Sequence, residues 1–308
     1  MDINKIYNMD CITGMKLIPD NCIQTCVTSP PYWGLRDYGV DGQLGLEQTP
    51  EEYVNKLVNV FREVRRLLRD DGTLWLNLGD SYASGGRGGG GSYATERSAW
   101  KSKSKVKGWR SAPAGLKNKD LVGIPWMVAF ALRADGWYLR SDIIWDKPNA
   151  MPSSVRDRPT RSHEYIFLLS KTSRYFYDAD SIREPQKTKD PKQLTFKRVK
   201  AKHSKPIPGQ SKTTHRDDRE DSIENAKGRN KRTVWTISTK PFTGAHFAVF
   251  PPELIKPCIT AGTHEGGVVL DPFMGAGTTA LVAKQLGRNY IGFELNSDYV
   301  RLAQDRLA

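Results

Sequence analysis

Long hydrophobic runs are missing from this 308-residue chain, and cysteine is scarce. No apolar run approaches the roughly 18 residues that a membrane-spanning helix needs, and residues 1–5 show no signal-peptide pattern. The four cysteines, at positions 11, 22, 26 and 258, lack the paired spacing of a zinc site. We therefore expect a reduced, cytoplasmic protein that uses neither a metal nor a membrane.

Acidic residues are also scarce relative to basic ones. The chain has 47 Lys and Arg against 34 Asp and Glu, a net charge of +13. Much of this excess lies in two polar segments: residues 100–120 contain seven basic residues against one acidic, and residues 187–232 contain 15 against six. The charge predicts a polyanionic partner such as a nucleic acid.

Apolar periodicity and turn residues predict strands that alternate with helices, which is typical of an α/β fold with a parallel sheet covered on both faces. The predicted strands are residues 5–9, 23–28, 73–78, 138–145, 164–170, 268–270 and 289–293. The predicted helices are residues 13–17, 50–69, 125–134, 252–261, 280–286 and 298–307. We expect strands 138–145 and 164–170 to form a hairpin at the sheet edge.

A compact polar turn follows the buried strand 23–28. It contains Ser29, Pro30, Pro31 and Tyr32. Because proline has no backbone N–H, the turn presents carbonyl oxygens and the Ser29 hydroxyl with few competing donors. Such acceptors suit the two protons of an exocyclic amino group, and the Tyr32 ring offers a face for stacking. Taken alone, a proline-rich turn beside core aromatic residues explains the stretch equally well.

A glycine turn near the C-terminus follows strand 268–270. Gly275 and Gly277 lie in this turn, which leads into a helix, so the backbone can approach a ligand and the helix start offers free N–H groups. Glu294 ends the next strand about twenty residues later, where a carboxylate suits the hydroxyls of a ribose. No G-x-x-x-x-G-K-[ST] pattern occurs, which argues against a P-loop.

Together the two segments resemble the amino-group DNA methyltransferases that use S-adenosylmethionine. In that family a D/N/S-P-P-Y/F motif is catalytic, and a D-P-F-x-G-x-G-T-T motif binds the cofactor; residues 29–32 and 271–279 match them. The stretches 74–80, 145–171 and 247–255 resemble further family segments in family order, so the resemblance covers nearly the whole chain. It implies a Rossmann-like, mostly parallel, seven-stranded sheet that is circularly permuted, with the catalytic motif first as in the β arrangement.

The resemblance also implies which residues bind S-adenosylmethionine. Phe250 and Phe273 would pack against it, and Gly275 and Gly277 would permit its close approach. Thr278 would bind its carboxylate. The full set of predicted cofactor-binding residues is Asp10, Phe250, Asp271, Phe273, Gly275, Gly277, Thr278 and Glu294.

Asp10 belongs to this set through the expected permutation. In a permuted sheet, strand 5–9 would lie beside strand 289–293, and Asp10 would lie near the cofactor motif. There it could accept a hydrogen bond from the adenine amino group. Alternatively, Asp10 caps helix 13–17.

The predicted catalytic residues are Ser29, Pro30, Pro31 and Tyr32. We expect the Ser29 hydroxyl and the Pro30 carbonyl to accept the amine protons of a flipped base, so that the nitrogen lone pair faces the methyl group. In the family, Ser at the first motif position favours cytosine N4, with adenine N6 as the alternative. An RNA or protein methyltransferase and an inactive DNA-binding adaptor are further alternatives.

Four further residues are considered for catalysis or for the pocket: Cys258, Trp33, Trp145 and His163. Cys258 follows Pro257, the pair that supplies the nucleophile in cytosine carbon-5 methyltransferases, but it precedes the cofactor motif and falls in an apolar helix, so we reject that chemistry. Trp33, Trp145 and His163 are candidates for the pocket, although core or loop positions suit them at least as well.

The domain prediction follows from the charge and the resemblance. Residues 1–186 and 241–308 would form the catalytic domain, with a glycine-rich, basic loop at 84–120. Residues 187–240 occupy the place of the family's target-recognition region, and its candidate phosphate contacts are Lys197, Arg198 and Lys200. The expected partner is double-stranded DNA, which would associate the protein with the nucleoid. The sequence leaves open whether a restriction endonuclease acts separately on the same DNA, and whether the protein is a monomer or a homodimer.

Overall fold

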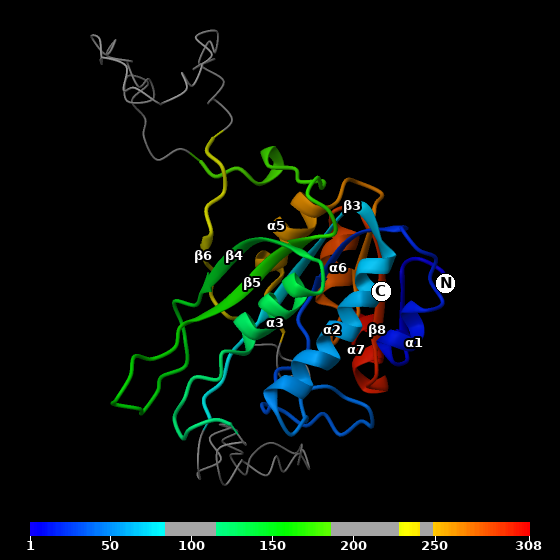
Figure 1. The fold of residues 1–308 in the computed structure, drawn as a ribbon. Coiled ribbons are helices and arrows are strands. Elements are labelled where there is room, and N and C mark those ends of the chain that lie inside the picture. The colour runs from blue at the N-terminus through cyan, green and yellow to red at the C-terminus, as the bar shows by residue number, and fades with distance from the viewer. Residues whose placement is uncertain (84–114, 186–227, 241–248) are drawn as a thin grey trace, which may run out of the picture. The chain divides into compact units, whose positions relative to one another are not determined.

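The computed structural model describes residues 1–83, 115–185, 228–240 and 249–308 (Figure 1). The chain divides into two compact units, one joining Met1–Asp178 with Arg232–Ala308, the other consisting of Ala179–Lys231. Within its described residues, the second unit contains the 3₁₀ turn Asp180–Ile182 and an antiparallel bridge between Glu184 and Arg229.

The described part of the first unit contains an eight-stranded sheet. Its strands are β1 (Lys5–Asn8), β2 (Ile23–Thr28), β3 (Leu68–Leu78), β4 (Tyr138–Asp146), β5 (His163–Ser170), β6 (Val234–Thr236), β7 (Val268–Asp271) and β8 (Asn289–Glu294). Their order across the sheet is β1-β8-β7-β2-β3-β5-β4-β6, and β5 alone among them runs antiparallel to its neighbours. The carboxyl ends of the other strands therefore share one edge with the amino end of β5.

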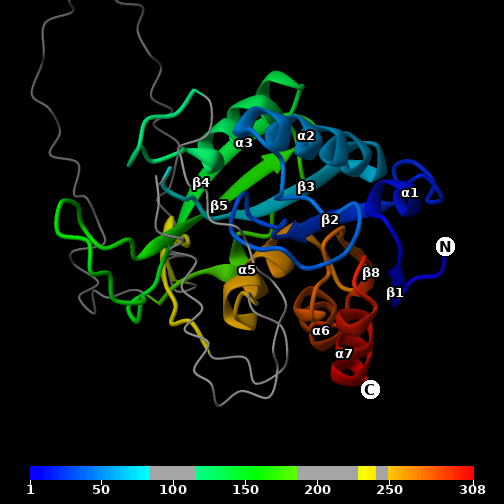
Figure 2. The ribbon, with the colours of Figure 1, turned by 90° about the horizontal axis from the view of Figure 1, so that it is seen from below.

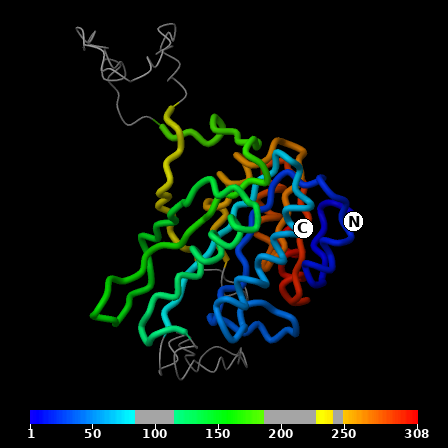
Figure 3. Tube along the Cα trace, in the orientation of Figure 1, coloured from blue at the N-terminus to red at the C-terminus, as the bar shows by residue number. Residues whose placement is uncertain are grey.

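The two ends of the chain meet in this sheet. β1 pairs in parallel with β8, which places Tyr7 opposite Phe293 and Asn8 opposite Glu294. Figure 3 shows the blue N-terminal trace beside the red C-terminal trace. The predicted mostly parallel α/β fold with a circularly permuted sheet is confirmed.

Helices cover both faces of the sheet. They are α1 (Cys11–Met15), α2 (Pro50–Leu67), α3 (Ile124–Ala134), α5 (Pro252–Gly262), α6 (Thr278–Gln285) and α7 (Ser297–Leu307). Figure 2 shows α1, α2 and α3 on one face, with α5, α6 and α7 on the other. None of the described helices is long and apolar enough to cross a membrane.

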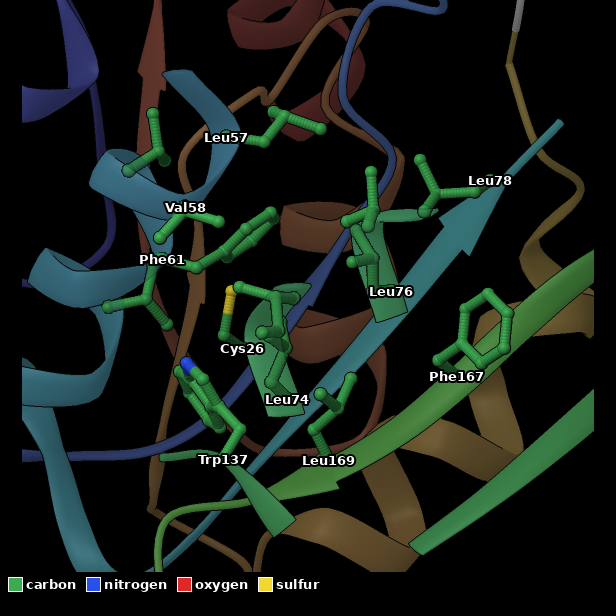
Figure 4. Close-up of a cluster of buried hydrophobic side chains, with 14 of the residues drawn as sticks. Cys26, Leu57, Val58, Phe61, Leu74, Leu76, Leu78, Trp137, Phe167 and Leu169 are labelled. Carbon is green, nitrogen blue, oxygen red and sulfur yellow. The ribbon is translucent and has the colours of Figure 1, made fainter. Parts of the chain in front are cut away.

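The core between α2 and the sheet positions part of the functional site. Phe61 of α2 points toward Cys26 of β2 and Leu74 of β3, and all three side chains are buried (Figure 4). Burying an apolar side chain of this size contributes about 1.5–3 kcal/mol. The same helix carries Tyr53, whose hydroxyl donates to the Pro31 carbonyl at 2.7 Å. Core packing thus fixes one side of the proline turn.

The sheet has one strand more than predicted. β6 pairs in parallel with β4, opposite residues 144–146, so the β4–β5 hairpin is not at the edge of the described sheet. β6 is three residues long with only its central Trp235 buried, so it gave no periodic signal. Residues 232–240, part of the predicted 187–240 insertion, lie in the first unit for this reason.

Several element boundaries also differ. α2 ends at Leu67 rather than at residue 69, and β3 begins at once with Leu68, which is opposite Ile23 of β2. Residues 69–72 are polar, and 70–72 were expected to separate the helix from the strand. They belong to β3 instead, and a register shift between Ile23 and Thr25 of β2 accommodates them. α1 begins at Cys11, two residues early, because Asp10 caps it.

Candidate active site

A cavity of about 780 Å³ opens at the edge where the parallel strands end. Residues that end or follow β1, β2, β4, β7 and β8 line it, together with Asn77 of β3 and Glu164 of β5. The cavity brings together the turn 29–32 and the glycine turn 271–278, which lie at opposite ends of the sequence. Parallel strands have their carboxyl ends at the same edge of the sheet, which explains why the two turns lie in one cavity.

Asp271 ties β2, β7 and α6 together beneath the glycine turn. Its Oδ1 accepts hydrogen bonds from Thr28 Oγ1 (2.6 Å) and Phe273 N (3.0 Å), and its Oδ2 accepts one from Thr279 Oγ1 (2.6 Å). Burial raises the pKa of Asp271 to about 6, although these hydrogen bonds favour the ionised form. This predicted cofactor residue borders the cavity and organises the turn around it.

Glu294 holds the glycine turn from the end of β8. Its Oε2 accepts the Gly275 N–H at 2.8 Å, and its Oε1 accepts the Asn296 N–H at 2.8 Å. Burial raises the pKa of Glu294. A carboxylate oxygen can accept more than one hydrogen bond, so both oxygens keep capacity for ligand hydroxyls. The rings of Phe250 and Phe273 line the same cavity.

The two ends of the glycine turn have different roles. Thr278 lines the cavity, and its Oγ1 accepts a hydrogen bond from Arg306 at 3.2 Å. The described lining does not include Gly277, which caps α6 with a φ of 78°. A Cβ built on Gly277 would lie 2.7 Å from the Ala303 Cβ of α7. The structure therefore shows that Gly277 makes room for α7.

Asp10 is both a cap and a cavity residue. Its Oδ1 accepts hydrogen bonds from Thr13 N (2.8 Å) and Thr13 Oγ1 (2.9 Å), so it caps α1. It also lines the cavity beside the end of β8. Its Oδ2 takes no part in these two bonds, so the capping role and a contact with a ligand are compatible.

The proline turn forms the other half of the cavity. Ser29, Pro30, Pro31 and Tyr32 all line it. The Pro31 carbonyl already accepts the Tyr53 hydroxyl, whereas none of the described residues donates a backbone or side-chain hydrogen bond to the Pro30 carbonyl. Ser29 Oγ and the Pro30 oxygen are thus the acceptors that this turn offers to a ligand.

Tyr32 is held firmly on this side of the cavity. Its hydroxyl donates to Glu164 Oε2 at 2.8 Å, with Asn77 Oδ1 as a second acceptor at 3.2 Å. Gly79 makes room for the ring, since a Cβ there would lie 2.4 Å from Tyr32 Cε2. Burial and the Glu164 carboxylate raise the pKa of Tyr32 well above its usual value, so the phenol stays protonated.

Sequence reasoning missed a polar wall next to Tyr32. Lys147 and Glu164 both line the cavity and form an ion pair in which the side chains are 17% and 18% exposed. Lys147 Nζ also lies 4.1 Å from the centre of the Trp145 ring. Asn77 donates to Glu164 Oε2 at 3.3 Å. The available signal was the position of polar residues at the ends of the predicted strands 138–145 and 164–170.

The remaining predicted residues lie elsewhere. Trp145 lines the cavity, whereas Trp33 is a core residue whose Nε1 donates to the Glu47 carbonyl at 3.0 Å. His163 contacts Tyr165 and is absent from the described lining. Cys258 is buried in α5, away from the lining, which agrees with the rejection of carbon-5 chemistry. Lys197, Arg198, Lys200 and most of 84–120 and 187–240 lie outside the described residues.

Comparison with known proteins assigns this arrangement to a family. Residues 23–305 match the model of the N6_N4_Mtase family, described as DNA methylase. The chain belongs to this family. It is 50% identical over 309 residues to the Type II methyltransferase M.SmaI of Serratia marcescens, covering 98% of this chain and 90% of the relative. The Type II methyltransferase M.Cfr9I of Citrobacter freundii is 46% identical over 303 residues, covering 98% and 87%.

Solved structures share the fold. The PvuII DNA methyltransferase (cytosine-N4-specific) superposes with a TM-score of 0.64 at 19% identity, covering 98% of this chain and 86% of that one. A putative DNA modification methylase from Thermus thermophilus, solved with S-adenosyl-L-methionine, has a TM-score of 0.59 at 23% identity, covering 99% and 93%. The resemblance to the amino-group DNA methyltransferases that the sequence motifs indicated is confirmed.

S-adenosylmethionine is the methyl donor of this family, and the cavity fits it. The Glu294 carboxylate, anchored on Gly275 N, suits the ribose hydroxyls. The rings of Phe250 and Phe273 offer apolar contacts for adenine. Thr278, at the start of α6, also lines the cavity, and its hydroxyl would bind the carboxylate of the cofactor. These residues would hold the cofactor, which when bound supplies an activated methyl group.

Proposed function

We propose that this methyltransferase transfers a methyl group to the N4 amine of a cytosine flipped out of a specific DNA sequence. The observation that carries the proposal is the shared cavity: Ser29 and Pro30 face the same space as Glu294 and Gly275. A base bound at the proline turn would thus lie next to a cofactor bound at the glycine turn.

The acceptors of the turn suit the chemistry of an aromatic amine. The lone pair of such a nitrogen is delocalised into the ring, which makes it a weak nucleophile. Ser29 Oγ and the Pro30 oxygen can accept both N–H protons and favour a pyramidal nitrogen whose lone pair points at the methyl group. The methyl group would pass from the sulfonium to the nitrogen, which leaves a neutral thioether, and the methylated amine would then release one proton to solvent. Hydrogen bonds that strengthen as the nitrogen becomes positive stabilise the transition state selectively.

The choice of cytosine rests on Ser29. In the family that the motifs resemble, Ser at this position mostly accompanies cytosine N4 and Asp mostly adenine N6. A neutral hydroxyl can accept a hydrogen bond from either amine, so methylation of adenine N6 is the alternative activity. The Type II names of the relatives support a role in restriction and modification, in which a separate endonuclease recognises the same sequence.

The decisive experiment identifies the methylated base. The protein is expressed in cells without DNA methylation of their own, and the nucleosides of their DNA are separated. We expect N4-methylcytosine; N6-methyladenine, 5-methylcytosine or no methylated base would overturn the proposal. Enzymatic tests with DNA, RNA and protein acceptors check the other methyltransferase classes; we expect methyl transfer to DNA alone.

Replacement of Ser29 tests its catalytic role. We expect Ser29→Ala to lower single-turnover methylation by about 100-fold or more, the range for loss of one transition-state hydrogen bond, while cofactor affinity stays the same. Ser173→Ala is the matched control, because Ser173 is exposed and follows the opposite end of β5. Lost cofactor binding with intact chemistry would contradict the role of Ser29.

A further inference from the structure

The polar wall beside Tyr32 has a donor and acceptor pattern of its own. We define it as Asn77, Trp145, Lys147 and Glu164, four cavity residues from the ends of β3, β4 and β5. Neither predicted motif contains any of them. A Lys–Glu pair with both side chains less than one fifth exposed is costly to desolvate, so its position in the substrate cavity points to a function.

The Glu164 carboxylate is largely saturated by the protein. Its Oε1 accepts from Lys147, and its Oε2 accepts from Tyr32 at 2.8 Å and from Asn77 at 3.3 Å. Three hydrogen bonds from the protein leave Glu164 less acceptor capacity for a ligand than Glu294 has. Its effect is to anchor the donors around it.

Lys147 keeps donor capacity toward the cavity. An ammonium has three N–H donors, and one of them binds Glu164. The Trp145 ring, 4.1 Å away, supports the ammonium from another side through a cation–π contact, and the Trp145 N–H is itself held by the Ile237 carbonyl at 2.7 Å. The wall thus presents a positioned cation with unused protons.

We infer that Lys147 donates a hydrogen bond to the O2 carbonyl of the flipped cytosine and so determines which base is methylated. The inference rests on the proposed cytosine-N4 activity. Glu164 is the positioning residue for both sides of the base, because its two oxygens bind the Lys147 ammonium and the Tyr32 hydroxyl.

The pairing edge of cytosine has groups that suit those of the cavity. That edge presents an amine donor, the N3 acceptor and the O2 acceptor; the cavity lining includes the acceptors of Ser29 and Pro30 and the Lys147 cation. Adenine has a C2–H group where cytosine has O2, so it would leave the Lys147 ammonium without that partner. A site built to bind a polar group discriminates strongly against an analogue that lacks it.

The test combines a variant of the protein with a variant of the base. Lys147→Met removes the positive charge from a side chain of similar length, and Lys147→Arg keeps the charge. Lys5→Met is the control, because Lys5 of β1 lies at the surface and forms an ion pair with Asp2. Each protein methylates DNA with cytosine or 2-thiocytosine at the target position, in which a weak sulfur acceptor replaces O2. Single-turnover rate, DNA affinity and cofactor affinity are measured.

The expected result is a loss specific to the hydrogen bond. The wild type, Lys5→Met and Lys147→Arg should prefer cytosine over 2-thiocytosine by about 10- to 100-fold, the range for a hydrogen bond to a charged group. Lys147→Met should slow cytosine methylation by a similar factor and lose most of the preference, with unchanged cofactor affinity. Glu164→Gln should also reduce the preference for cytosine over 2-thiocytosine, but by a smaller factor than Lys147→Met.

Two outcomes would overturn the inference, and they are distinguishable. If the wild-type product is N4-methylcytosine but Lys147→Met keeps the full preference for cytosine over 2-thiocytosine, the inference fails and the proposed activity stands. If the wild-type product is N6-methyladenine, the proposed activity fails and the inference falls with it.

Discussion

At the scale of single residues, the carboxylates of the predicted cofactor site form many of their hydrogen bonds with the protein itself. Asp271 accepts hydrogen bonds from Thr28, Phe273 and Thr279 while fully buried. Glu294 binds two backbone N–H groups before it meets a ligand. Such contacts fix the atoms that face the cavity, so the motif is partly a support for the cavity wall.

The raised pKa of Asp271 predicts how stability depends on pH. Its pKa rises from 3.8 unfolded to about 6 folded, so the folded state binds the proton more tightly. This contribution to stability is complete below pH 3.8 and is lost as the pH rises through 6. The full shift is worth about 3 kcal/mol at about 1.4 kcal/mol per pKa unit, so the stability of the wild type relative to Asp271→Asn should fall by about 2 kcal/mol between pH 4 and pH 7.

Urea unfolding of both proteins across this pH range measures the difference. Comparison with Asp142→Asn, an exposed carboxylate on β4, accounts for the general effect of removing one negative charge. A difference between wild type and Asp271→Asn that stays constant from pH 4 to pH 7 would show that Asp271 titrates normally in the folded protein.

At the scale of elements, Gly277 joins α6 to α7. Its φ of 78° disfavours any residue with a Cβ, and the Cβ would lie 2.7 Å from that of Ala303. We expect Gly277→Ala to lower the free energy of unfolding by at least about 2 kcal/mol, since the left-handed conformation alone costs about 1–2 kcal/mol. Cofactor affinity of the folded protein should change little, because Gly277 is outside the described lining.

Two variants separate the causes of this loss. Gly266→Ala has a similar φ of 77° with no atom within 4 Å, so it reports the backbone cost alone. Ala303→Gly in the Gly277→Ala background should recover the part due to the contact. Cofactor affinity that falls by an order of magnitude while the protein remains folded would instead place Gly277 against the cofactor.

At the scale of the whole molecule, we predict that positive charge and the second unit contribute to DNA binding. Glu184 and Arg229 exchange two backbone hydrogen bonds of 2.9 Å, and their side chains form an ion pair at 3.1 Å. The ends of the basic segment between them are thus held together. We expect replacement of residues 187–226 by a short Gly-Ser linker to leave cofactor binding intact and abolish sequence-specific methylation.

The salt dependence of DNA binding measures the charge contribution. Log affinity should fall linearly with log salt, with a slope of about −0.9 per phosphate contacted. Alanine at Lys197, Arg198 and Lys200 should flatten that slope, with the Lys5→Met variant as control. Undiminished sequence-specific methylation after the replacement would show that recognition lies outside residues 187–226.

The sequence by itself determined the reaction class, the cofactor and most of the fold. Residues 29–32 and 271–279 are short motifs whose chemistry depends on adjacent residues, and the apolar periodicity of the strands and helices is local as well. Only the tertiary structure decided which groups share the cavity. Lys147, Glu164, Asn77 and Tyr32 come from four separate stretches of chain, and although polar residues at strand ends are a local signal, it does not show that these four meet. The same holds for Gly277, whose neighbour Ala303 is 26 residues away, and for β6, which is defined by its pairing with β4.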